Sequence, residues 1–110
     1  MTLELSKIDA AKNQLETAVR LFFHDDGDIV SIHTLVRASH EILERLCSGK
    51  NIKSMYEEII ENVKKDKVKE LRAIVDEPKN FFKHSNRDSD KTLEFNPQSS
   101  EFFLWDACRL

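Results

Sequence analysis

The sequence predicts an all-α protein, a mainly antiparallel bundle of four to five helices that forms a single domain over residues 1–110. Only two glycines and two prolines occur, so few hairpin turns are expected. Apolar residues recur at helical spacing along successive segments, and no stretch alternates with period two for long. The breaks between these segments are short, which favours antiparallel packing of neighbouring helices.

Capping residues define the first two helices. Ser6 is a typical N-cap, and the apolar stripe that follows it ends at the polar run of residues 25–28. Asp28 is the expected N-cap of the second helix. The second stripe ends at Ser48-Gly49, a combination that is typical of a helix C-terminus.

Three further segments complete the bundle. Apolar residues between positions 52 and 63 predict a third helix, and a fourth begins near Asp66. Residues 85–97 are polar and predict a connecting loop. Asn96-Pro97, a cap followed by proline at the first helical position, begins a final helix over residues 98–110. That helix would be truncated if the chain is a fragment of a longer protein.

Composition points to a cytoplasmic protein without a membrane segment. No apolar run approaches the roughly 20 residues that span a bilayer, and the first residues do not resemble a signal peptide. Cys47 and Cys108 are too few for a disulfide framework or a zinc cluster. The net charge of −3 argues against general nucleic-acid binding, but residues 62–91 carry nine basic side chains against six acidic ones. This segment is either a phosphate-binding face or a solvated helix surface.

The segment Lys79-Asn80-Phe81-Phe82-Lys83-His84 carries the strongest functional signal in the chain. The apolar stripe of the fourth helix continues through Pro78, which predicts a kinked helix or two nearly coaxial helices. On this helical wheel Asn80 and His84 are neighbours opposite the apolar stripe, and the two lysines lie on its flank. We therefore expect His84 to face solvent or another subunit.

This segment resembles the signature of the HEPN superfamily, in which an arginine is followed by a polar residue, commonly asparagine, and by a histidine a few positions later. The resemblance covers these six positions in detail, and the bundle from about residue 6 to residue 87 in outline. It implies a small all-α domain that binds RNA or cleaves it without a metal, or a non-catalytic module, in toxin–antitoxin, phage-defence or nucleotide-transfer systems. The sequence departs from the signature at Lys79, which replaces the arginine and lacks its bidentate fork.

Metal-independent RNA cleavage would divide its tasks among these residues. His84 would transfer a proton, because histidine exchanges protons near neutral pH. Lys79, Lys83 and Arg87 would hold phosphates, and Asn80 would orient the imidazole or bond the ribose. No cofactor or metal is expected. Each chain supplies one such histidine, so the second acid–base group would come from another chain or from a different residue type.

Three polar residues, His33, Arg37 and His40, follow one edge of the apolar stripe in the second helix. We expect them to pack at the boundary of the bundle, to form a salt-bridged edge, or to provide a second wall of the cleft over the motif. A shared metal site is not expected, because the seven-residue separation of the two histidines corresponds to roughly 10 Å along a helix.

The chain is expected to form a homodimer. Residues 102–110 are apolar on more than one face, and a small bundle would leave part of that surface exposed. Pairing with a second copy would bury the surface and bring two His84 side chains together. The alternative function is a catalytically silent helical module that dimerises or binds a protein partner, such as an antitoxin.

Overall fold

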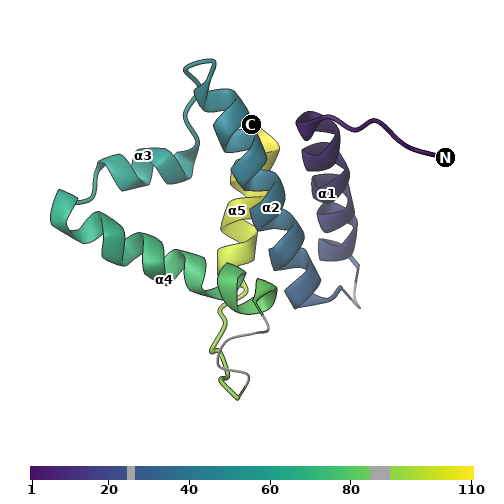
Figure 1. The fold of residues 1–110 in the computed structure, drawn as a ribbon. Coiled ribbons are helices and arrows are strands. Elements are labelled where there is room, and N and C mark those ends of the chain that lie inside the picture. Colours follow the sequence, from purple (N-terminus) through teal and green to yellow (C-terminus); the bar gives the residue numbers. More distant parts are fainter. Residues whose placement is uncertain (25–26, 85–89) are drawn as a thin grey trace.

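A computed structural model describes residues 1–24, 27–84 and 90–110 and contains five α-helices among them (Figure 1). They are α1 (Lys7–Phe22), α2 (Ile29–Ser48), α3 (Met55–Glu61), α4 (Lys65–Lys83) and α5 (Gln98–Arg109). The described part of the chain has no β-strand. The predicted all-α helical bundle is therefore confirmed.

Local hydrogen bonds begin the helices where the sequence predicts. Ser6 forms a capping box with Asp9: the backbone N–H of each residue donates to the side chain of the other, at 3.0 and 3.1 Å. The Asp28 carboxylate accepts from the N–H of Val30 at 3.1 Å. Asn96 accepts from the N–H of Gln98 at 3.0 Å, with the intervening proline already in helical conformation. The caps are short-range features, which is why the sequence alone locates them.

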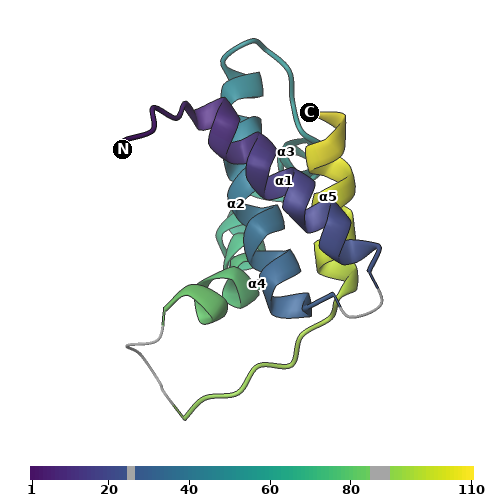
Figure 2. The ribbon, with the colours of Figure 1, turned by 90° about the vertical axis from the view of Figure 1, so that its right-hand side faces the viewer.

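Three helices form the body of the molecule. α1 runs antiparallel to α2, whereas α5 runs beside α2 in the same direction (Figures 1 and 2). Residues from four helices meet in one core cluster, which consists of Ala18, Ile32, Val36, Tyr56, Ile60, Phe103 and Leu104. α5 is therefore a central element, and it buries Phe103, Leu104 and Ala107 within its own chain. This burial removes most of the surface on which we based the expected homodimer, although Trp105 is still 51% exposed.

The α3–α4 hairpin projects from this body as an arm (Figure 1). α4 has no fully buried residue, and the side chain of Ile74, expected on its apolar stripe, is 63% exposed. The radius of gyration is 14.9 Å, larger than the roughly 13 Å typical of a compact domain of this length. One face of the arm packs on the core cluster through Val68, Leu71 and Val75, and the other face lies in solvent.

α4 continues through Pro78 as one helix, not as two. Proline has no N–H to donate and crowds the preceding turn of the helix. The carbonyl of Val75, three residues before the proline, accepts from the Arg37 guanidinium at 3.1 Å, which ties this part of α4 to α2. None of the helices described here is long and apolar enough to cross a membrane.

Candidate functional site

The last turn of α4 presents a cation, an amide and an imidazole to solvent. Asn80, Lys83 and His84 are all exposed, as the helical wheel predicts. His84 is the C-cap residue: its backbone leaves the helix in an extended conformation while its N–H donates to the carbonyl of Asn80 at 2.9 Å. Arg87, the other expected phosphate ligand, lies outside the described residues.

Two phenylalanines anchor this turn on the body of the protein. Phe81 and Phe82 are partly buried. The ring of Phe82 meets that of His33 edge-on, at 5.9 Å between centroids, and that of Phe95 at 5.3 Å. Because the phenylalanines face inward, the polar residues of the same turn face outward.

Lys79 is engaged by two carboxylates, which the sequence did not reveal. Its ammonium group forms a short ion pair with Glu41 of α2 and lies 3.8 Å from the Asp76 carboxylate. The side chain is 23% exposed. An ammonium has three N–H donors and Glu41 takes one of them, so Lys79 still has donors for a phosphate, but its charge is largely compensated.

Arg37 is almost fully buried, at 2% exposure, beneath the C-terminal half of α4. Its guanidinium donates to the Asp76 carboxylate at 2.7 Å as well as to the carbonyl of Val75. The same group lies 4.1 Å from the ring centroid of Phe103, within cation–π range. Arg37 therefore fixes where the motif-bearing half of α4 lies against α2 and α5.

His33 and His40 lie inside the protein, at 0% and 1% exposure. Of the three roles expected for them and Arg37, the wall of an open cleft is therefore wrong, whereas a salt bridge is present between Arg37 and Asp76. His33 Nδ1 shares a hydrogen bond of 2.8 Å with the Ser100 hydroxyl, and His40 Nε2 lies 2.9 Å from the Asp106 carboxylate. Both partners belong to α5, which explains how polar residues are accommodated in the interior.

Asp106 connects three helices and is itself fully buried. Besides His40 it accepts from the backbone N–H groups of Met55 at 2.9 Å and Tyr56 at 3.1 Å, the first residues of α3. Burial alone would raise the pKa of Asp106, but the hydrogen bonds from these three donors outweigh it and lower the pKa below its ordinary value. The one signal in the sequence was an acidic residue within the apolar run of residues 102–107.

His33 should make the protein less stable in mild acid. Burial lowers the pKa of His33 from 6.5 to about 4, and the charge of Arg37 acts in the same direction. The unfolded chain therefore binds a proton in this range that the folded chain rejects. This contribution to stability is fully present above pH 6.5 and is lost as the pH falls towards 4, by about 3 kcal/mol.

Urea unfolding of the wild type and of His33→Gln at a series of pH values measures the effect. Glutamine can keep a hydrogen bond to Ser100 but does not titrate. The stability difference between the two proteins should change over this pH window, in favour of the variant at low pH. Parallel curves would contradict a neutral His33.

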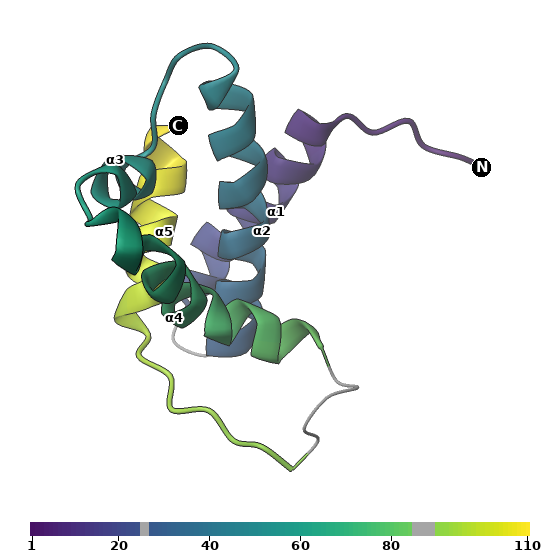
Figure 3. The same cartoon turned by 60° about the vertical axis from the view of Figure 1, so that its left-hand side comes forward.

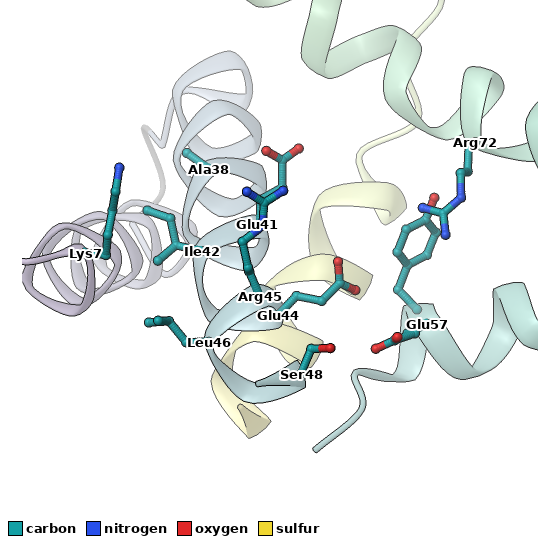
Figure 4. A pocket seen from close by; sticks show the side chains of 11 residues that line it. Lys7, Ala38, Glu41, Ile42, Glu44, Arg45, Leu46, Ser48, Glu57 and Arg72 are labelled. Atoms are coloured by element: carbon teal, nitrogen blue, oxygen red, sulfur yellow. The ribbon is translucent and has the colours of Figure 1, made fainter. Parts of the chain in front are cut away.

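An open groove of about 550 Å³ crosses the exposed face of α2 (Figure 4). Lys7, Ile42 and Leu46 lie at one end of this α2 groove, and Glu57 and Arg72 lie at the other, with Glu41, Glu44 and Arg45 between them. Tyr56 also lines the groove, with the Arg72 guanidinium 5.8 Å from its ring centroid. Glu41 thus connects the groove to Lys79.

Within the described ranges, no group of three or more histidine, cysteine or acidic residues is placed to hold a metal ion. No family model, curated protein or solved structure matches this chain.

Proposed function

We propose that the C-terminal turn of α4 binds RNA and that His84 takes part in cleaving it, as the HEPN-like motif implies. The observation that carries the proposal is the joint exposure of Asn80, Lys83 and His84 on one helical turn. These three side chains combine a phosphate ligand, a hydrogen-bonding amide and a proton-transfer group. An N–H of Lys79 that does not bond Glu41 would add a second contact to the phosphate.

The chemistry requires two proton transfers and no metal. A base takes the proton of a ribose 2′-hydroxyl, whose oxygen attacks the adjacent phosphorus. The bond to the 5′-oxygen breaks, and an acid protonates that oxygen. The products are a 2′,3′-cyclic phosphate and a 5′-hydroxyl. His84 would fill one role, and the His84 of a second chain or another residue type would fill the other, while Lys83 offsets the charge on phosphorus.

Incubation of the purified protein with mixed RNA in EDTA tests this function. We expect cleavage that persists in EDTA and leaves 2′,3′-cyclic phosphate ends. Activity that EDTA abolishes, or products that end in a 3′-hydroxyl, would contradict the mechanism. Absence of both cleavage and RNA binding would favour the second candidate function.

That second candidate is a catalytically silent interaction module. It is favoured by the exposed apolar surface of the arm, of which Ile74 is the most exposed residue on α4. The ion pairs of Lys79 also favour the interaction module, because two carboxylates already neutralise the ammonium that a phosphate would otherwise contact. A module of this kind would bind a protein through α4 and leave RNA unbound.

Removal of the Glu41 charge should strengthen RNA binding. Glu41→Gln frees the Lys79 ammonium, and we expect affinity for a labelled single-stranded RNA to rise by about two- to fivefold, the scale of one exposed ion pair. Lys79→Ala should lower affinity and reduce the slope of log K against log salt by about 1, whereas Lys79→Arg should maintain or raise affinity.

Fluorescence anisotropy at several salt concentrations measures these changes. Glu16→Gln, which removes an exposed carboxylate from α1, is the matched control for net charge. Equal RNA affinities for the wild type and the Glu41 and Lys79 variants would show that Lys79 does not contact a phosphate of the RNA.

A further inference from the structure

The first residues of the chain form an exposed apolar strap, here defined as residues 2–6. Leu3 and Leu5 are 74% and 63% exposed, and they alternate with Thr2 and Glu4. In an extended chain this alternation puts both leucines on one face. The strap extends away from α1 in all three views (Figures 1, 2 and 3). The peptide groups of residues 2–5 have no hydrogen-bond partner among the described residues.

The α2 groove, in turn, contains buried polar side-chain atoms that lack hydrogen-bond partners. The Tyr56 hydroxyl and one Glu57 carboxylate oxygen are buried atoms without a hydrogen-bond partner in the described structure. Tyr56 is only 7% exposed. Burial, and then the charge of Asp76, raise the pKa of this hydroxyl, which therefore remains a donor. Groups of this kind cost stability until an acceptor or a donor reaches them.

The rest of the groove offers apolar and cationic contacts, because its carboxylates Glu41 and Glu44 are already hydrogen-bonded to Lys79 and Ser54. Leu46 is 41% exposed, and Ile42 lies partly exposed one helical turn away. Arg45 projects between the two ends of the groove and forms no ion pair with any residue that the structure describes. An occupant should thus be extended, apolar on one face, acidic at one position and rich in unpaired peptide groups.

We propose that the α2 groove binds the strap of a second copy of this chain. Leu3 and Leu5 pack on Ile42 and Leu46, and Glu4 pairs with Arg45. Carbonyl and N–H groups of the strap backbone bond the Tyr56 hydroxyl and the Glu57 carboxylate, as in peptides that dock through their main chain. Five extended residues span roughly 17 Å, enough to cross one helix. The exchange is reciprocal, as a two-fold dimer requires. It does not depend on RNA binding.

Sedimentation velocity from micromolar to hundreds of micromolar protein tests the exchange. We expect a concentration-dependent dimer in the wild type. The double variant Leu3→Asp/Leu5→Asp should raise the dimer dissociation constant more than about a hundredfold, because two buried leucines are replaced by charges. These residues are exposed in the single chain, so its fold should survive, which circular dichroism checks.

Reversing the charges of Glu4 and Arg45 tests whether these two residues pair across the dimer. Glu4→Arg and Arg45→Glu should each weaken the dimer about fivefold, and the two together should restore it to near the wild-type value. Ile74→Asp, at the exposed apolar position of the arm, is the matched control and should leave the dimer unchanged.

Three results would overturn the exchange. One is a wild-type protein that stays monomeric throughout, including a monomer whose strap is protected from proteolysis and so lies on its own groove. Another is a dimer that is indifferent to the leucine substitutions. The third is a dimer that Ile74→Asp disrupts, which would assign the interface to the arm.

Discussion

Replacement of His84 by alanine is expected to lower the rate of RNA cleavage by about 10²–10⁴-fold, the usual loss when a general acid or base is removed. His84 is the exposed imidazole of the motif, and it lies directly beyond the last helical residue of α4. Its side chain forms no hydrogen bond or ion pair with any residue that the structure describes, so no structural role is apparent for it. The substitution should therefore remove chemistry and leave the fold unchanged.

The measurement is the initial rate of appearance of 2′,3′-cyclic phosphate ends in EDTA, with the protein in excess over RNA. His24→Ala is the matched control, because His24 is also exposed and also follows a helix C-terminus. That variant should cleave at the wild-type rate. Undiminished activity in His84→Ala would remove His84 from the mechanism, and an equal loss in both variants would show that the loss is not specific to His84.

The sequence reveals the helices because their ends depend on neighbouring residues. Ser6, Asp28 and Asn96 each bond a backbone N–H two or three positions away, so the relevant pattern is short and complete within the sequence. The outward direction of Asn80 and His84 was equally predictable, because helical spacing alone sets it. These are the parts of the candidate site that sequence analysis described correctly.

The remainder of the site depends on contacts between distant residues. Arg37 and His40 were expected near the edge of a stripe, since isolated helix α2 gives no reason to bury them. Their partners are 39 and 66 residues further along the chain, in α4 and α5. The pairing of Lys79 with Glu41 spans 38 residues. Only the packed structure shows which charges of the motif are free and which are already paired.

The apolar periodicity of the sequence also could not predict the position of α5. Residues 102–110 carry apolar side chains on more than one face, a pattern that fits either a surface patch or a central helix. The structure selects the central position, because α5 lies in contact with α1, α2 and α3. Asp106 then has to be buried among them, and its hydrogen bonds become a requirement of the fold.

Asp106→Ala is accordingly expected to lower the free energy of unfolding by about 3–5 kcal/mol, because three donors lose their shared acceptor, at about 1–3 kcal/mol for each buried one. The substitution removes the acceptor of His40 and uncaps the N–H groups of Met55 and Tyr56 at the start of α3. For a small domain with about 5–15 kcal/mol of total stability, this loss is at least about a fifth of the total and at most all of it. Urea denaturation followed by circular dichroism gives the value.

Two matched variants separate the buried carboxylate from a general effect on α5. Glu101→Ala removes an exposed acidic residue from the first turn of the same helix and should change stability by less than about 0.5 kcal/mol. His40→Ala combined with Asp106→Ala should cost less than the sum of the single substitutions, because both delete the same contact. Amide exchange at Met55 and Tyr56 should also accelerate in Asp106→Ala, since the side-chain acceptor that they share is lost. A stability change below about 1 kcal/mol, or full additivity with His40→Ala, would show that this carboxylate does not hold α3 to the body of the protein.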